Sequence, residues 1–230
     1  KKFKKLAIIP ARIGSRRILK KNIRKLDGVP ILSYTIRAAI SSKIFDKIHV
    51  STDSEEVIKV CQDFDIAVDF MRPHGLSKNN VKLNDVIKFV ISEFEDRKQR
   101  FDFFCMLWPT APLRNAEDIK KSFKLITKYN ANAVVGVSDY DLPFYCGQKL
   151  DNKGYISKIF KNKFWSSKNN KVICDNGSLV WNKVSAFKKF KTWLPPQTIG
   201  FLMPKYKSVD LNEEEDWHLL EFYYNKYAKK

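Results

Sequence analysis

The sequence predicts an α/β fold with a doubly wound, mostly parallel sheet, and three observations lead to this prediction. Short apolar runs bounded by turn residues alternate with segments of helical period along the chain. The run over residues 103–108 is apolar throughout, which is typical of a strand covered on both faces. The chain has 230 residues, of which 44% are hydrophobic, enough for one domain with a substantial core. We therefore expect a single domain over residues 1–230.

In the first half of the chain, strands and helices are expected to alternate from the start. A helix after Pro30 is indicated by Leu32 and Ile36, which recur at helical spacing. Asp53 stands three residues before Glu56, a pattern that resembles a capping box at the start of the next helix. The expected strands of this half cover residues 6–9, 47–51 and 68–70, and a further helix is expected over residues 84–95.

The second half continues the alternation and then departs from it. Strands are expected over residues 103–108, 133–137, 178–182 and 200–209, and helices over residues 117–128 and 213–227. Residues 139–171 are instead polar, aromatic and rich in Lys and Asn. We expect this segment to form a small inserted hairpin lobe. Its aromatic residues would suit a contact between two subunits, so a homodimer is expected, with contacts from Phe144, Tyr145, Tyr155 and Trp165.

Several classes of protein are disfavoured by composition. No apolar run approaches the roughly 18 residues of a membrane span. The apolar run over residues 6–9 ends at Pro10 and is too short for the core of a signal peptide, so a cytoplasmic protein is expected. The four cysteines lie far apart and form no C-x-x-C pair, which disfavours a disulfide scaffold or a zinc site. Cys61 and Cys105 lie among apolar neighbours and are expected in the core.

The chain is strongly basic, and this property alone does not identify a ligand. Lys and Arg number 43 against 25 Asp and Glu, a formal net charge of +18. Nucleic-acid binding is one interpretation of such a charge. The lysines are spread along the whole chain, however, which also fits a solvated surface or the attraction of anionic ligands.

The loop after the first expected strand carries the clearest chemistry. Residues 10–22 read PARIGSRRILKKN, with one Gly, one Ser and five cations. Ligands of such sheets bind beyond the carboxyl ends of the strands. Gly14 would let the backbone approach a polyphosphate, Ser15 would donate a hydrogen bond, and the cations would neutralise charge. The pattern is neither G-x-G-x-x-G nor G-x-x-x-x-G-K-[ST], so dinucleotide and Walker-type binding are disfavoured.

This loop resembles the A-R-x-G-S-[KR]-x(4)-K-N signature of the CMP-sialic acid synthetases, or acylneuraminate cytidylyltransferases. Further motifs of that family follow in order over essentially the whole chain. They are Ser51-Thr-Asp53, Arg72-Pro-x-x-Leu-Ser77, Pro109-Thr-Ala-Pro-Leu-Arg114, Asn176-Gly177 and Asp210-Leu-Asn212. The resemblance implies a Rossmann-like fold of the nucleotide-diphospho-sugar transferase type. It also implies transfer of CMP from CTP to the anomeric hydroxyl of a nonulosonic acid, with release of pyrophosphate.

The resemblance assigns expected roles to individual residues. The triphosphate of CTP would be held by Arg12, Gly14, Ser15, Arg16 and Lys21, and the nucleoside by Asn22 and Arg72. Arg12, Lys21 and Asp210 would be catalytic, since this transfer needs positioning and charge neutralisation more than a covalent nucleophile. Mg²⁺ would be held by Asp210 and Asn212. The family has a second carboxylate where Asn212 stands, so one ligand charge is missing here.

The sugar pocket departs from the usual pattern of the family. Trp108 stands where many members have a Gln that helps to hold the sugar. The arginine that binds the sugar carboxylate in sialic acid enzymes aligns near Cys174, where this chain has no guanidinium. The segment around Asp175 and Asn176 looks closer to the pseudaminic acid branch. The expected sugar contacts are therefore Trp108, Thr110, Asp175 and Asn176, and the expected sugar is a pseudaminic or legionaminic acid relative.

Three other interpretations stay open on the sequence alone. A cytidylyltransferase for an eight-carbon 3-deoxy-keto acid would share the first loop. A non-catalytic sugar-nucleotide binder is suggested by Asn212 and would bind CTP without releasing pyrophosphate. A basic nucleic-acid-binding domain would bind with an affinity that falls steeply with salt.

Overall fold

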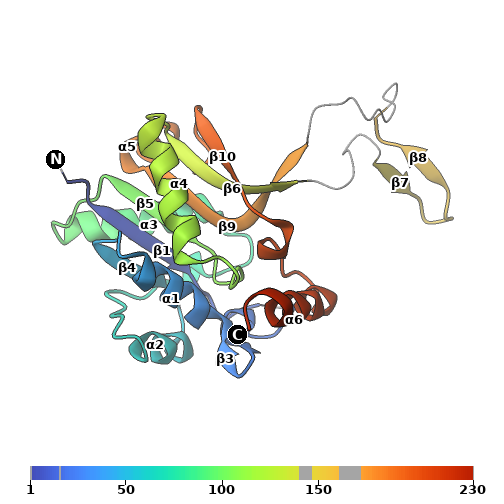
Figure 1. Ribbon diagram of the computed structural model, residues 1–230, viewed down its shortest axis with the longest axis horizontal. Helices are drawn as coiled ribbons and strands as arrows, with labels where there is room; N and C mark the ends of the chain where they lie inside the picture. The colour runs from blue at the N-terminus through green and yellow to red at the C-terminus, as the bar shows by residue number, and fades with distance from the viewer. Residues whose placement is uncertain (1, 16, 140–146, 161–171, 230) are drawn as a thin grey trace.

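The computed structural model describes residues 2–15, 17–139, 147–160 and 172–229. Their central feature is a six-stranded sheet of order β10-β6-β9-β5-β1-β4 (Figure 1). β9 runs antiparallel to both its neighbours, and the other pairings are parallel, so the expected mostly parallel sheet is confirmed. The strands are β1 (Lys5–Pro10), β4 (Lys47–Ser51), β5 (Phe103–Leu107), β6 (Ala133–Asp139), β9 (Ile173–Lys183) and β10 (Thr198–Leu202).

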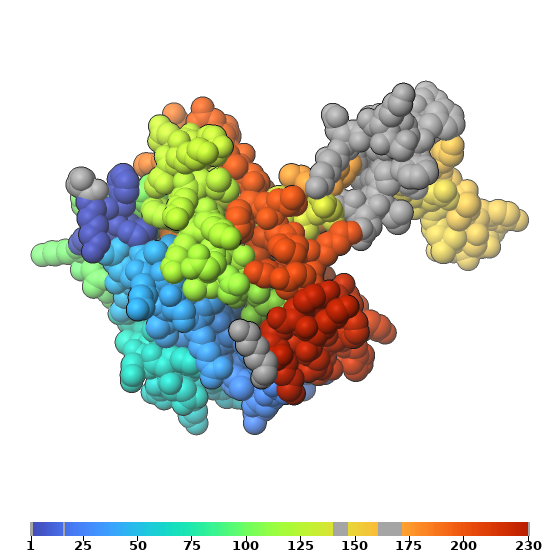
Figure 2. All heavy atoms as spheres, viewed as in Figure 1, coloured from blue at the N-terminus to red at the C-terminus, as the bar shows by residue number. Residues whose placement is uncertain are grey.

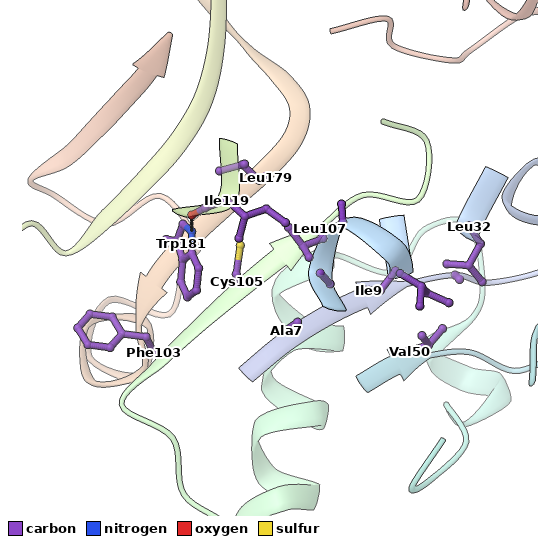
Figure 3. Close-up of a cluster of buried hydrophobic side chains, with 14 of the residues drawn as sticks. Ala7, Ile9, Leu32, Val50, Phe103, Cys105, Leu107, Ile119, Leu179 and Trp181 are labelled. Carbon is purple, nitrogen blue, oxygen red and sulfur yellow. Dashed lines mark hydrogen bonds between the residues drawn. The ribbon is translucent and has the colours of Figure 1, made fainter. Parts of the chain in front are cut away.

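Three helices cover one face of the sheet. They are α1 (Ile31–Ser42), α2 (Glu55–Gln62) and α4 (Ala116–Lys128). Alternate residues of β1, Ala7 and Ile9, point into this layer and pack among apolar helix residues such as Leu32. Figure 3 shows this core, where the indole nitrogen of Trp181 donates to the backbone oxygen of Ile119 at 3.3 Å. The buried indole is therefore satisfied as well as packed.

The other residues of β1, Leu6 and Ile8, face the opposite layer, which is built from two helices. These are α3 (Leu83–Asp96) and α5 (Val184–Phe190). A strand whose two sides are both buried must be apolar at every position, which explains the continuous runs in β1 and β5.

A third apolar cluster lies at the end of the sheet. Helix α6 (Glu214–Tyr227) packs Trp217 and Leu220 against a short hairpin, β2 (Lys25–Leu26) and β3 (Val29–Pro30). The turn of this hairpin is Asp27-Gly28, with φ of 49° and 77° at the two residues. Positive φ at both central residues is the requirement of a type I′ hairpin turn, which Asp-Gly meets. Leu211, just before α6, is buried in the same cluster.

The expected inserted lobe is described only in part. Residues 147–160 contain a second antiparallel hairpin, β7 (Gln148–Leu150) and β8 (Ile156–Lys158). Figure 1 shows its yellow strands away from the main sheet, and the same yellow segment stands apart from the body of the protein in Figure 2. Tyr155 is exposed there together with Leu150 and Ile156. The other aromatic residues proposed for a subunit contact, Phe144, Tyr145 and Trp165, lie outside the described residues.

Several expected elements differ from those found. Residues 68–70 form no strand, and their contacts with β4 are made by side chains. Lys47 Nζ donates to Asp69 Oδ1 at 2.7 Å, and the His49 and Phe70 rings stack with centroids 4.2 Å apart. The strand expected over residues 200–209 ends before Pro204, which has no N–H to donate. β9 is longer than expected, and α5 was not expected at all.

The start of α2 also corrects an expectation. The N-cap is Ser54, whose side chain accepts from the backbone N–H of Glu56 at 3.2 Å. Asp53 is therefore free of the capping role, and its carboxylate instead accepts from the backbone N–H of Ile13 at 3.2 Å.

Two expectations from composition can be compared with the fold. Cys61 and Cys105 are both buried, as expected for core residues. Within the described ranges, no helix combines the length and apolar character needed to cross a bilayer.

Gly136 gives a prediction about stability. A Cβ at this position would lie 2.8 Å from Asn176 Oδ1 and 3.1 Å from Met203 Sδ, in the sheet beside a β6–β9 register shift. We expect Gly136→Ala to lower the free energy of unfolding by about 1–3 kcal/mol in chemical denaturation, because the buried neighbours must move. Gly75→Ala is the matched control, since its Cβ would meet nothing within 4 Å. Equal stabilities of the two variants would contradict the packing described here.

Candidate active site

The carboxyl ends of β1, β4 and β5 meet at a cavity of about 240 Å³. Four segments line it: the loop after β1, the turn at Arg72, residues 76–86 and the turn after β5. The expected site residues that line it are Arg12, Ser15, Lys21, Asn22, Arg72, Trp108 and Thr110. A second cavity of about 340 Å³ adjoins it, since both are lined by Arg12, Ser15, Lys21 and Asn79.

Hydrogen bonds to its backbone fix the conformation of the loop after β1. The backbone N–H of Ala11 donates to Ser51 O at 2.9 Å, which continues the pairing of β1 with β4. Asp53 then receives the N–H of Ile13, and the side-chain amide of Asn22 donates to Arg12 O at 2.8 Å. Asn22 is buried, so its bond to Arg12 O holds the loop from the side of the protein interior. The loop is therefore fixed at both ends before any ligand arrives.

Three cations that line the cavity are oriented by neutral oxygen atoms. Arg12 Nη1 donates to Ser77 O at 3.1 Å and to Asn79 Oδ1 at 2.7 Å. Lys21 Nζ donates to the backbone oxygen of Leu211. Among the described residues, none of Arg12, Lys21 and Arg72 has a carboxylate partner within 4.0 Å.

Arg72 is likewise oriented by neutral oxygen atoms. Its Nη2 donates to Ser51 O at 2.6 Å and its Nε to Ser51 Oγ at 3.1 Å. The guanidinium is buried, and burial lowers its pKa to about 10, against the opposing effect of the nearby Asp53 carboxylate. Arg72 thus stays charged at neutral pH while facing the cavity.

Cations just outside the cavity are arranged differently, because they are paired with carboxylates. Lys20 bonds Glu56 at 2.7 Å, and Arg24 bonds Glu214 at 2.6 Å. A cation held by a carboxylate is neutralised, whereas one held by a carbonyl keeps its full charge for a ligand. Among the described residues, the cavity therefore gathers cations that are not paired with a carboxylate within 4.0 Å.

The surroundings of Lys21 disfavour its charged form. Desolvation lowers the pKa of the Lys21 ammonium, the charges of Arg17 and Arg12 lower it further, and Asp210 and Asp216 act in the opposite direction. A strongly anionic ligand in the cavity would raise the pKa of Lys21 again, since a nearby opposite charge favours the protonated amine. The electrostatics thus fit a polyphosphate.

The two expected metal ligands lie next to each other beside Lys21. Asn212 Nδ2 donates to Asp210 Oδ2 at 2.7 Å. The pKa of the nearby Asp175 carboxyl is raised, chiefly by desolvation and also by the charge of Asp210. Asp210 is exposed and, among the described residues, has no cation within 4.0 Å. An exposed, unpaired carboxylate fits a divalent cation that shares its other ligands with water and phosphate. The described residues hold no group of three or more acidic, His or Cys side chains suited to an all-protein metal site.

Not every expected site residue is brought to the cavity. Asn176 is buried, receives the N–H of Ser178 at 3.1 Å and donates to Ser208 Oγ at 3.2 Å, which are structural contacts. Asp175 also lies outside the cavity lining. Gly14 is exposed in the loop, where a Cβ would meet nothing within 4 Å. Arg16 lies outside the described residues.

Four residues of the site were given no role in it from the sequence. Arg17 and Asn79 line the second cavity, Asp53 holds the loop, and Ser77 supplies a backbone acceptor. Arg17 is one of the five loop cations, and Asp53 and Ser77 belong to two of the motifs that resemble the family. Their contacts were not predicted, because the partners are 40 to 67 residues away.

The lowered pKa of Lys21 gives a prediction about pH. Lys21 is charged below its pKa and loses the charge as pH rises through it, so affinity for CTP should fall at a lower pH than for an ordinary lysine. We expect Lys21→Arg to shift this alkaline loss of affinity to higher pH, measured by calorimetric titration of CTP. Lys20→Arg, at a surface residue paired with Glu56, is the control and should leave the profile unchanged. The same profile in Lys21→Arg as in the wild type would exclude Lys21 as the titrating cation.

Comparison with known proteins agrees with this arrangement. The sequence model described as "Cytidylyltransferase" matches residues 6–176. A pseudaminic acid cytidylyltransferase of Campylobacter jejuni is 28% identical over 225 residues, covering 96% of this chain and 97% of the relative. A CMP-N,N'-diacetyllegionaminic acid synthase of Legionella pneumophila is 32% identical over 223 residues, 94% of each chain.

A solved structure with the same fold is that of CMP:2-keto-3-deoxy-manno-octonic acid synthetase in complex with CTP. It superposes with a TM-score of 0.68 over 97% of this chain and 99% of its own, at 13% identity. The expected Rossmann-like α/β fold is thereby confirmed. With the family match covering most of the sequence, this chain belongs to the cytidylyltransferase family and is a nucleotidyltransferase.

Proposed function

We propose that this chain transfers CMP from CTP to the anomeric hydroxyl of a sialic acid-like nonulosonic acid, for the assembly of cell-surface glycans. The hydroxyl oxygen attacks the α-phosphorus, the bond from that phosphorus to the oxygen bridging to the β-phosphorus breaks, and pyrophosphate leaves. The hydroxyl proton passes to water. The observation that carries the proposal is that three cations of the cavity lining, Arg12, Lys21 and Arg72, are oriented by neutral oxygen atoms and have no carboxylate within 4.0 Å in the described part of the chain.

The loop after β1 supplies the triphosphate contacts. Within the described residues, Arg12 makes its two side-chain bonds through Nη1, so the other donors of its guanidinium are available to phosphate oxygens. Lys21 and Ser15 line the same space. Fixed cations around a leaving pyrophosphate stabilise the charge that develops as the bond breaks. Gly14 and Arg16 belong to the same loop and are proposed as further phosphate contacts.

Arg72 and Asn22 are the proposed contacts of the nucleoside. Cytosine offers O2 and N3 as acceptors, and the buried Arg72 guanidinium and the Asn22 amide are donors in the cavity lining. Both side chains are already fixed by bonds to backbone oxygens, which limits the entropy lost on binding.

Mg²⁺ is the proposed cofactor, with Asp210 as its protein ligand. The carboxylate is exposed, lacks a cationic partner among the described residues and lies close enough to Lys21 to affect its pKa. When bound, the ion would supply further neutralisation of the triphosphate. The amide oxygen of Asn212 already accepts a bond from the cationic Arg17, which makes it a poorer ligand for Mg²⁺ than the Asp210 carboxylate.

The acceptor is proposed to be a pseudaminic or legionaminic acid relative. One side of the cavity is apolar, formed by Val81, Leu83, Val86 and Trp108, with Thr110 beside them. Such a wall suits the acyl methyl groups and deoxy carbons of these sugars better than a fully hydroxylated chain. The names of the Campylobacter and Legionella relatives point the same way. Asp175 stays a proposed sugar contact that would require the bound sugar to extend beyond the cavity.

A homodimer in the cytoplasm is part of the proposal. The β7–β8 hairpin exposes Leu150, Tyr155 and Ile156, each at more than 60% of its free surface. A second copy of the chain would remove this apolar surface from water.

The decisive experiment is pyrophosphate release from CTP and Mg²⁺ with a panel of sugar acids. We expect release with pseudaminic or legionaminic acid to exceed that with neuraminic acid by tenfold or more, since one or two apolar contacts give about 1–3 kcal/mol of discrimination. Preference for the eight-carbon 3-deoxy acid would support the alternative substrate, whose synthetase shares the fold. Binding of CTP without release across the panel would instead support a non-catalytic binder.

A further inference from the structure

Asn212 has both ends of its side chain engaged. Its amide nitrogen donates to Asp210 Oδ2 at 2.7 Å, and its amide oxygen accepts from Arg17 Nη2 at 2.6 Å. A guanidinium can only donate and an ionised carboxylate can only accept, so the two partners fix which way the amide points. The oxygen that could bind a metal is directed at a cation instead.

The backbone around Asn212 is fixed as well. The N–H groups of Asn212 and Glu213 both donate to Asp216 Oδ2, at 2.7 and 2.8 Å, in the capping box that starts α6. Leu211 is buried, and its carbonyl receives Lys21 Nζ. The segment before α6 is therefore joined to the loop after β1 at two points, through Lys21 and through Arg17.

Arg17 lies where a triphosphate would extend beyond the first cavity. It lines the second cavity together with Arg12, Ser15, Lys21 and Asn79. Its other bond, from Nη1 to Glu213 Oε1, is 3.3 Å long, and both side chains are 59% exposed. This contact is longer than the Lys20–Glu56 and Arg24–Glu214 pairs, which are 2.7 and 2.6 Å apart, so it compensates less of the charge of Arg17.

We propose that Asn212 is a positioning residue for the triphosphate site rather than a weakened metal ligand. Its amide oxygen directs Arg17 toward the triphosphate without neutralising it, and its amide N–H holds Oδ2 of Asp210 so that Oδ1 stays free for a divalent cation. A carboxylate at this position would neutralise Arg17 and repel Asp210. The proposal rests on the proposed function, because it takes CTP as the ligand.

The test is CTP binding without metal, in EDTA, measured by calorimetry for the wild type, Arg17→Ala, Asn212→Ala and the double variant. We expect Arg17→Ala to weaken binding about tenfold, the scale of one charge-assisted hydrogen bond. Asn212→Ala should weaken it about threefold or more in the wild type, and not further in the Arg17→Ala background, because Asn212 acts through Arg17. Lys20→Ala removes a neighbouring cation that is paired with Glu56 and should change binding less than twofold.

Two results would overturn the proposal. Unchanged metal-free affinity in Asn212→Ala, with weaker Mn²⁺ binding to the CTP complex, would make Asn212 a metal ligand. Equal losses in both backgrounds would show that Asn212 does not act through Arg17. Failure of the wild type to bind CTP with or without metal is a separate result, which would refute the proposed function and this proposal together.

Discussion

The site depends on one constraint: cations must be held in place without being neutralised. A carboxylate partner would fix a guanidinium or ammonium firmly but would cancel the charge that a triphosphate requires. Here the orienting atoms are backbone carbonyls, an amide and a hydroxyl, as for Arg12 with Ser77 O and Lys21 with Leu211 O. Desolvation, together with the charges of Arg17 and Arg12, lowers the pKa of Lys21 in this arrangement.

The periphery of the fold makes these acceptors available. Leu211 O is in reach of Lys21 because Leu211 is buried with Trp217 of α6 beside the β2–β3 hairpin. Ser51 O lies at the end of β4, where the sheet register places it beside the start of the loop. Packing far from the chemistry thus sets the direction of each cation, and changes in the α6 cluster should be felt at the triphosphate site.

The sequence was sufficient for the main elements and for the loop, but not for its supports. Apolar runs such as residues 103–107 and the cations after β1 are local patterns. The first forms β5, and the family match confirms the resemblance that the second carried, while the role of each cation stays a proposal. Asp53 looked like a helix cap because its spacing to Glu56 is right, yet it bonds Ile13, 40 residues away. Asp27-Gly28 is a strong hairpin signal, yet the β2–β3 hairpin is absent from the elements expected from the sequence. The acceptors of Arg12 and Lys21 are 65 and 190 residues distant, beyond any local pattern.

The most direct test of the account is hydrogen–deuterium exchange of the backbone amides with and without CTP and Mg²⁺. If the cations held by neutral oxygens form the triphosphate site, CTP should slow exchange most over residues 11–22 and 72–83. Protection centred instead on the groove between α3 and α5, which Lys88 and Lys191 line, would place the nucleotide elsewhere and contradict the account.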